Sequence, residues 1–176
     1  MPLSSQIIDP HPQYTRYAQW FFNAPLVIMT YSVHAGFPLI DSLLPLLMTD
    51  AAVVLGLFGT LAPQQYKWAY FIMSVSALFN VFGHLLSNTV HGAHSTSTYQ
   101  TRMQHVRSIF ALASIWTIYP IIWAFSEGWG VISTADTAIY YGFADLLSGP
   151  VFLVYILWTH EYEHVEPIEF PRDTKA

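Results

Sequence analysis

Several ionisable side chains of this sequence lie inside long apolar stretches, where a charge is costly to bury and is therefore a candidate for function. The candidates are Arg16, Asp50, His84 and Asp145, with Glu127 near the end of a stretch. An arginine and an aspartate that face one interior could pair, and each would offset the desolvation of the other. The same residues could equally hold helices together as a structural polar contact.

The stretch FADLLSGPVF, residues 143–152, joins an acid to a Gly-Pro pair within one apolar run. Asp145 and Gly149 are four residues apart, so a helix places them on one face, about 6 Å apart along its axis. Pro150 has no N–H for the carbonyl of Leu146, which predicts a kink. The sequence therefore predicts an acid beside an interruption of its helix.

Aromatic residues form a second pattern. IWTIYPIIWAF places Trp116, Tyr119 and Trp123 at spacings of three, four and seven residues, on one face of a helix. Pro120 lies inside this stretch and would free a backbone carbonyl, and Trp20 precedes another proline in RYAQWFFNAPLV. Rings around a kinked interior suit a flat conjugated ligand. The same residues could equally form an aromatic core or a belt at the membrane interface.

The sequence gives little support for a metal site, a catalytic site or a nucleic-acid site. His91, His94 and His105 lie in a polar stretch without a nearby Cys, Asp or Glu, which is more typical of a solvated loop than of a metal site. No Ser-His-Asp arrangement, phosphate loop or HExxH motif is present, and no basic patch for nucleic acid. The chain has no cysteine, which excludes disulfides and thiol catalysis. We therefore expect no metal site, no enzyme activity and no nucleic-acid partner.

The composition indicates a membrane protein. Of 176 residues, 53% are hydrophobic and only 10% charged, whereas soluble domains average about 25% charged residues. We predict an all-α protein with five spanning helices, since about 20 apolar residues cross a hydrocarbon core of roughly 30 Å. The helices are expected over residues 14–34, 39–61, 66–90, 102–127 and 134–160. The predicted parts are an N-terminal segment 1–13, a helical bundle 14–160 and an acidic tail 161–176.

Turn chemistry separates the predicted helices. Gly36, Gly128 and Gly130 are expected to end helices, and Ser133 or Thr134 to cap the last one. The orientation follows from Lys and Arg, which are commoner on the cytoplasmic side. One side would carry Arg102, Arg107, Arg172 and Lys175, and the other only Arg16 and Lys67. We therefore expect the N-terminus outside and the C-terminus in the cytoplasm.

The longest motifs resemble those of the microbial, or type I, rhodopsins. RYAQWFFNAPL resembles the family's third helix, R-Y-x-D-W-x-x-T-x-P, and WTIYPIIWAFSEG its sixth, W-x-x-Y-P-x-x-W followed by S-E-G. FADLLSGPVF is similar to the seventh, in which an Asp precedes the retinal lysine by four residues. YKWAYFIMSVSAL and MTDAAVVLGLFG are similar to the fifth and fourth, with Asp50 at the family's acid. The resemblance covers nearly all of residues 14–158 and implies a truncated seven-helix fold.

The departures from the family pattern bear on function. The retinal-lysine position is Gly149, and the only lysines are Lys67 and Lys175, so covalent retinal is not expected. The family's proton acceptor, the Thr one turn on and the proton donor are replaced at three positions. These altered proton-transfer positions are Gln19, Asn23 and Thr30. The resemblance thus implies that light-driven proton pumping is lost.

Other family residues are retained. They imply an opsin-like pocket of Trp20, Trp116, Tyr119, Trp123, Asp145 and Gly149, and a counter-ion network of Arg16, Tyr119 and Asp145. The set resembles the lysine-less fungal opsin-related branch, the heat-shock-protein-30-like membrane proteins. That branch implies a stress-linked plasma-membrane protein with a chaperone-like or regulatory role. Its expected partners are the lipid bilayer and either another membrane protein, such as a proton-pumping ATPase, or further copies of itself.

Two alternatives stay open. One is an ion path along Arg16, Tyr119, Asp145 and Asp50. The other is a noncovalent ligand, retinal or another polyene, with Gly149 leaving room where a lysine stem would lie. Because the resemblance starts at the family's third helix, we also expect part of the pocket wall to open to lipid and the chain to need a partner.

Overall fold

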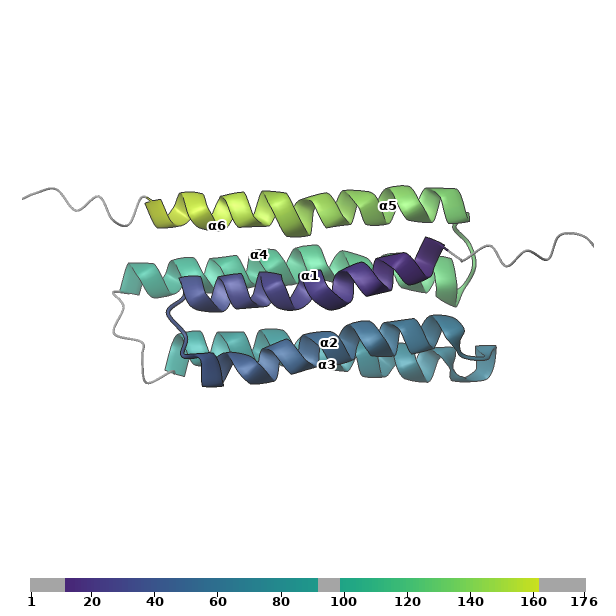
Figure 1. Ribbon diagram of the computed structural model, residues 1–176, viewed down its shortest axis with the longest axis horizontal. Coiled ribbons are helices and arrows are strands. Elements are labelled where there is room, and N and C mark those ends of the chain that lie inside the picture. The colour runs from purple at the N-terminus through teal and green to yellow at the C-terminus, as the bar shows by residue number, and fades with distance from the viewer. Residues whose placement is uncertain (1–11, 92–98, 162–176) are drawn as a thin grey trace, which may run out of the picture.

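The computed structural model describes residues 12–91 and 99–161, which form a bundle of long helices (Figure 1). In chain order the elements are α1 (Pro12–His34), α2 (Leu39–Leu61), α3 (Gln64–His91), α4 (Tyr99–Trp123), η1 (Ala124–Gly128), α5 (Thr134–Leu146), η2 (Leu147–Val151) and α6 (Phe152–Glu161). η1 continues α4, and η2 joins α5 to α6, so five helical rods result. The predicted all-α fold and its five helices are confirmed, with bounds within a few residues.

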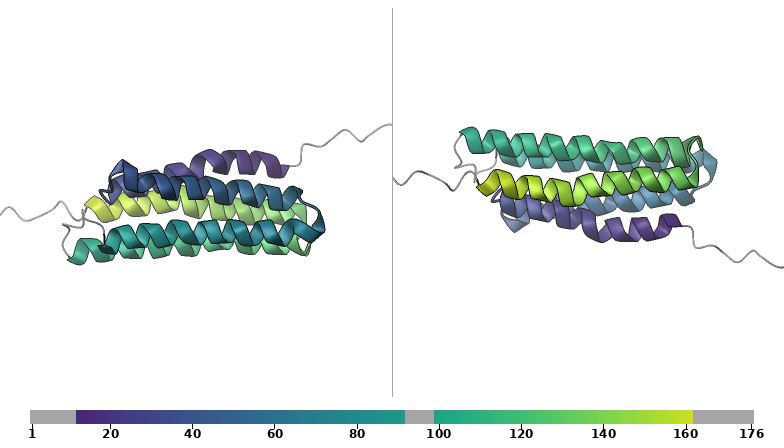
Figure 2. Two further views of the ribbon diagram at one scale, coloured as in Figure 1. Left: turned by 90° about the horizontal axis from the view of Figure 1, so that it is seen from below. Right: turned by 90° about the horizontal axis from the view of Figure 1, so that it is seen from above.

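The rods alternate in direction along the chain. Figure 1 shows the start of α1, the α2–α3 turn and the η1–α5 turn at one end of the bundle, here called the N-terminal end. Sequential helices pack side by side, and α1 also contacts α6. The two views of Figure 2 place α1 along one side of the bundle and α3 and α4 along the other. α1 and α5 consequently run in the same direction.

Four of the rods are long and apolar enough to cross a membrane, namely Leu39–Leu61, Gln64–His91, Tyr99–Gly128 and Thr134–Thr159. α1 is as long as α2, at 23 residues, but it does not reach the same apolar content. The reason lies in its first half, which carries Arg16, Gln19 and Asn23. α1 therefore lies in the bundle as expected, although its composition alone would not identify it as a span.

Glycine residues follow the ends of rods, and a serine caps the start of one, as their chemistry predicts. Gly36 and Gly130 adopt positive φ angles of 72° and 66°, which side chains with a Cβ rarely adopt. Ser133 is the N-cap of α5, and its hydroxyl accepts a hydrogen bond from the Asp136 backbone N–H at 3.2 Å. These residues fix where α1 ends and where α5 begins.

The predicted interruption near Pro150 takes the form of a π-helical turn, η2. A π turn bonds residue i to i+5, so it absorbs one extra residue and the missing proline N–H. The expected α-helical spacing between Asp145 and Gly149 does not hold, because Gly149 lies within this wider turn. Pro120 lies within α4, which stays α-helical to Trp123 before the π turn η1 begins.

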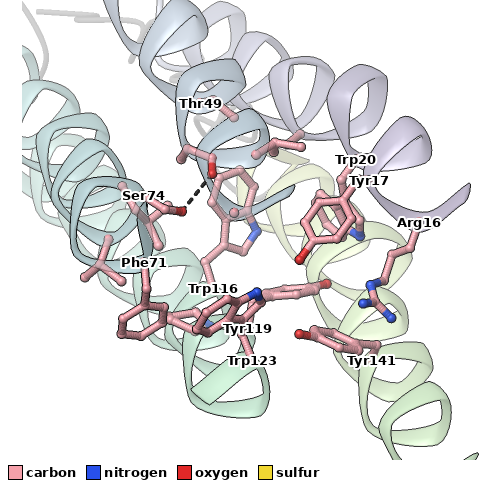
Figure 3. Close-up of a pocket in the computed structure, with 17 residues that line it drawn as sticks. Arg16, Tyr17, Trp20, Thr49, Phe71, Ser74, Trp116, Tyr119, Trp123 and Tyr141 are labelled. Atoms are coloured by element: carbon pink, nitrogen blue, oxygen red, sulfur yellow. Dashed lines mark hydrogen bonds between the residues drawn. The ribbon is translucent and has the colours of Figure 1, made fainter. Parts of the chain in front are cut away.

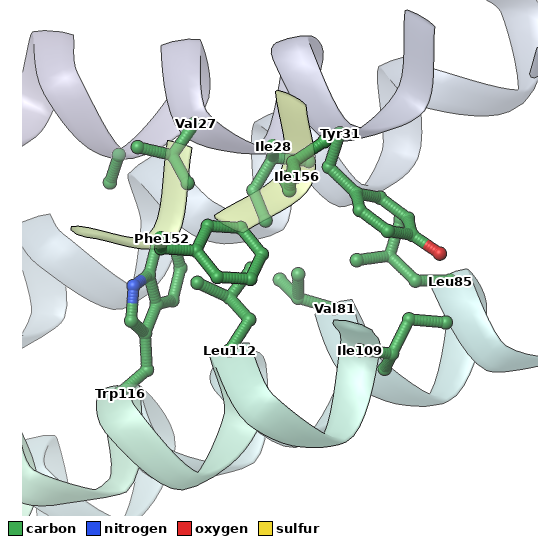
Figure 4. Close-up of a cluster of buried hydrophobic side chains, with 11 residues drawn as sticks. Val27, Ile28, Tyr31, Val81, Leu85, Ile109, Leu112, Trp116, Phe152 and Ile156 are labelled. Atoms are coloured by element: carbon green, nitrogen blue, oxygen red, sulfur yellow. The ribbon is translucent and has the colours of Figure 1, made fainter. Parts of the chain in front are cut away.

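A cluster of buried apolar side chains fills the half of the bundle away from the N-terminal end (Figure 4). Its members on α1, α3, α4 and α6 include Ile28, Leu85, Leu112 and Phe152, each at most 1% exposed. Lipid tails are as apolar as this core, so close packing rather than removal from water stabilises it. The outer faces carry exposed large hydrophobic residues, as a surface in contact with lipid requires.

Candidate functional site

An aromatic pocket occupies the other half of the bundle, nearer the N-terminal end (Figure 3). Its cavity measures about 130 Å³, well above the roughly 10–15 Å³ that one water needs. Residues of α1, α2, α3, α4 and α5 line it, including Arg16, Tyr17, Phe71, Ser74 and Tyr141. Most of its wall consists of rings and aliphatic side chains, so it is suited to an apolar guest.

The four aromatic residues singled out in the sequence all lie on this wall: Trp20, Trp116, Tyr119 and Trp123. The ring centroid of Trp20 lies 4.9 Å from that of Tyr119 and 6.0 Å from that of Trp116, with the rings edge to face. Trp123 stacks on Phe71 with centroids 4.9 Å apart. The three-and-four spacing on α4 therefore does place its rings around one interior.

Asp145 joins three rods through hydrogen bonds rather than lining the cavity. Its Oδ1 accepts from the Trp20 indole N–H at 2.9 Å and from the Tyr119 hydroxyl at 2.7 Å. Tyr119 also shares a hydrogen bond of 2.8 Å with Ser148. Sequence reasoning missed Ser148, although its place one turn after the acid was a usable signal. The carboxylate holds α1, α4 and the α5–η2 rod in register.

Arg16 does not pair with Asp145, contrary to the expected counter-ion network. Among the described residues no ion pair joins the two, and the guanidinium lies 3.6 Å from the ring centroid of Tyr141. The register explains this. α1 and α5 run in parallel, so when Trp20 meets Asp145, the residue four earlier on α1 meets the residue four earlier on α5, Tyr141. The Nη2 atom of Arg16 is buried and lacks a hydrogen-bond partner.

A second polar contact, unforeseen from the sequence, centres on Thr60 of α2. Its hydroxyl lies 2.9 Å from the Tyr17 hydroxyl and accepts from the Trp123 indole N–H at 3.1 Å. Gly59 permits this approach, since a Cβ there would lie 3.0 Å from Trp123 Cζ2. Thr60 offered no signal because a threonine in an apolar helix usually bonds its own backbone, which Thr60 also does at Gly56.

The three altered proton-transfer positions do not face the pocket. Gln19, Asn23 and Thr30 are exposed on the outer side of α1. The Thr30 hydroxyl donates to the Leu26 carbonyl of its own helix at 2.8 Å. The structure therefore separates these positions from the Trp20–Tyr119–Asp145 cluster.

Gly149 does not line the cavity, yet space surrounds it. A Cβ at this position would meet no atom within 4 Å beyond its own helix and its chain neighbours. Lys67 lies in the first turn of α3, where its ammonium donates to the Glu127 carbonyl at 2.9 Å. Lys175 lies outside the described residues. No lysine among the described residues therefore lines the pocket.

The remaining candidates lie apart from the cavity. Asp50 is half-buried, and its Oδ1 has no hydrogen-bond partner. His84 lies 3.2 Å from the Asp41 carbonyl, beside a hollow between α2 and α3. His91 is exposed and His94 lies outside the described residues, while His105 accepts from Tyr31 through its carbonyl. The described residues contain no cluster of side chains that could hold a metal ion.

Comparisons with known proteins agree with this geometry. The family described as Bacteriorhodopsin-like protein matches residues 3–161. Protein FDD123 of Trametes versicolor is 37% identical over 82% of this chain and 51% of its own length. Opsin-like protein carO of Fusarium fujikuroi is 32% identical over 84% of this chain and 48% of its own length. The chain thus spans about half the length of these relatives.

Solved structures give the same result. The light-driven proton pump rhodopsin CsR of Coccomyxa subellipsoidea is 31% identical, with a TM-score of 0.76 over 84% of this chain and 65% of that one. The light-driven proton pump LR (Mac) of Leptosphaeria maculans is 26% identical, with a TM-score of 0.78 over 85% of this chain and 61% of that one. The chain therefore belongs to the bacteriorhodopsin-like family of microbial rhodopsins, in its fungal opsin-related branch.

Proposed function

We propose that this chain is a non-photochemical opsin-related membrane protein, which keeps the pocket of the family but forms no covalent retinal pigment. The observation that carries the proposal is Gly149, at the position where the resemblance implies the retinal lysine. Lys67 does not take the place of that lysine, because it lies outside the cavity lining, where its ammonium donates a hydrogen bond to the Glu127 carbonyl. The proton pumping of the two solved relatives is accordingly not proposed for this chain.

For the cellular role we propose a regulatory or chaperone-like function at the fungal plasma membrane under stress. The N-terminus would lie outside and the C-terminus in the cytoplasm. The resemblance to the heat-shock-protein-30-like branch supports the role, and the Lys/Arg distribution supports the orientation. A partner, either a membrane protein such as a proton-pumping ATPase or a second copy, would cover the outer side of α1. The polar residues exposed there support this part of the proposal.

A visible absorption spectrum tests the main proposal. The protein is purified with all-trans retinal beside a pigment-forming relative as positive control. We expect only the band of free retinal, because a strong red shift usually requires a protonated Schiff base. Gly149→Lys provides a matched variant, and the open space around position 149 favours its side chain. A red-shifted band in the unaltered protein would refute the proposal.

A second candidate function is noncovalent binding of a polyene in the pocket. The cavity lined by Trp20, Trp116 and Tyr119 favours it, since aromatic walls suit a conjugated guest. Saturable binding of retinal without a red shift would support it. An ion path receives less support, because Thr30 lies on the outer side of α1 instead of extending the polar cluster inward. Ion flux into liposomes that disappears in Asp145→Asn would reverse this order.

A further inference from the structure

Most polar groups on the pocket wall are already bonded within the protein. The hydroxyls of Tyr17, Thr49 and Ser74 bond to Thr60, to the Pro45 carbonyl and to the Ala52 carbonyl, the last drawn in Figure 3. The side chains of Trp20, Tyr119 and Trp123 are bonded as described above. Few polar groups on this wall are therefore left to form hydrogen bonds with a ligand.

Two buried polar atoms of wall residues lack a hydrogen-bond partner, and both are donors. They are Nη2 of Arg16 and Nε1 of Trp116, whose side chain is only 4% exposed. The other two unpartnered buried atoms of the described residues belong to Ser32 and Asp50, which do not line the cavity. Because a buried donor without an acceptor is costly, the wall favours a guest that brings acceptor oxygens.

The charge on the cavity wall also favours a ligand with acceptor oxygens. Arg16 is the one formal charge among the residues that line the cavity, and its guanidinium lies 3.6 Å from the ring centroid of Tyr141. The face of Tyr141 compensates part of this charge, but a ring attracts a cation less than a carboxylate does. Asp145 is occupied by Trp20 and Tyr119. An anion that entered the cavity would supply a counter-charge to Arg16 from the cavity side.

We propose that the pocket binds a flat apolar ligand that ends in a carboxylate, with the carboxylate bound by Arg16 and the tail lying against the wall that Trp20, Trp116 and Tyr119 line. The inference rests on the ligand-binding candidate of the proposed function and adds the head group to it. A guanidinium offers a planar pair of donors that fits a carboxylate, whereas an alcohol or aldehyde supplies no charge. The aromatic side walls select a conjugated tail.

Three all-trans retinoids with one shared polyene test the head group: retinoic acid, retinal and retinol. The whole chain is placed in nanodiscs of uncharged lipid at pH 8, and binding is followed by quenching of tryptophan fluorescence, with empty nanodiscs correcting for partition into lipid. We expect retinoic acid to bind at least about tenfold more tightly than retinol, since a hydrogen bond to a charged group is worth that much or more.

Substitutions then test which residue causes the preference for retinoic acid over retinol. Arg16→Gln is expected to bring the affinities for acid and alcohol together, and Arg16→Lys to restore part of the difference. Arg102→Gln, which removes a cation near the start of α4 and away from the cavity, should leave the preference unchanged.

The possible outcomes separate this inference from the function on which it rests. Equal binding of acid and alcohol by the unaltered protein would overturn the carboxylate proposal and leave ligand binding in place. An acid preference that survives in Arg16→Gln would overturn the role of Arg16. Absence of saturable binding by all three retinoids would overturn the inference together with the ligand-binding candidate. A red-shifted band with retinal would instead overturn the non-photochemical proposal.

Discussion

At the residue scale, two side chains centre the hydrogen bonds that join the rods around the pocket, Asp145 and Thr60. The sequence pointed to Asp145 and Tyr119, because an acid and a phenol in apolar helices each need a partner. It pointed to the wrong third partner. A motif shows which residues are present, but which residue of α1 faces α5 depends on the rotation and axial shift of two packed helices. That shift brings Trp20 to Asp145 and Arg16 to Tyr141.

Loss of the Asp145 acceptor should destabilise the bundle. Asp145→Leu leaves the Trp20 indole N–H without its acceptor and the Tyr119 hydroxyl with Ser148 alone, at an expected cost of about 1–3 kcal/mol in the free energy of unfolding. Asp145→Asn retains an amide oxygen in the same place and should cost clearly less. Thermal unfolding in detergent, followed by circular dichroism, compares the two variants. Equal melting temperatures for Asp145→Leu and the unaltered protein would show that the network contributes no stability.

A double-mutant cycle distinguishes the observed contacts from the expected ion pair. Arg16→Gln and Asp145→Asn should be additive to within about 0.5 kcal/mol, because the two side chains do not pair. Trp20→Phe and Asp145→Leu should show a coupling energy of about 0.5–3 kcal/mol, because each single substitution removes the same hydrogen bond. Unfolding free energies of the single and double variants give both couplings. A strong Arg16–Asp145 coupling would mean that the two form an ion pair in the membrane.

At the element scale, the lengths of the apolar stretches and the turn residues Gly36, Gly130 and Ser133 made the helices predictable. The π turns η1 and η2 were not predictable as such. Proline marks a lost N–H, but whether the helix then kinks or widens depends on the neighbours that pack around it. The outward position of Gln19 and Asn23 was not predictable from the motif, since the side of α1 that faces the interior depends on how the helix is rotated in the bundle.

Gly59 tests how closely α2 and α4 must approach. A Cβ in Gly59→Ala would lie 3.0 Å from Trp123 Cζ2 and press on the indole that bonds Thr60. We expect a loss of about 1–3 kcal/mol in the free energy of unfolding, typical of overpacking. Gly142→Ala is the matched control, because a Cβ there meets no atom within 4 Å and alanine favours the helix by about 1 kcal/mol. Similar melting temperatures for both variants would contradict the close contact.

At the scale of the whole molecule, the outer side of α1 combines polar and apolar side chains. It exposes Gln19, Asn23 and Thr30 beside Phe22 and Leu26, which are 67% and 58% exposed. Polar side chains in membranes seldom face lipid and usually bond to a neighbouring helix. Amides carry both donor and acceptor groups, so a second copy can pair with Gln19 and Asn23 across a two-fold axis. We therefore propose self-association through the outer side of α1.

Cross-linking can test this association directly, because the chain has no cysteine of its own. Asn23→Cys introduces one thiol on the outer side of α1, and Phe79→Cys introduces one on α3, where the native side chain is 73% exposed. In native-like membranes a short thiol cross-linker should convert Asn23→Cys to a dimer and leave Phe79→Cys monomeric. Adding Gln19→Leu should reduce the yield, since it removes one pairing amide. Equal yields at both positions would indicate random collision, and a monomer with cooperative melting would show that α1 needs no second copy.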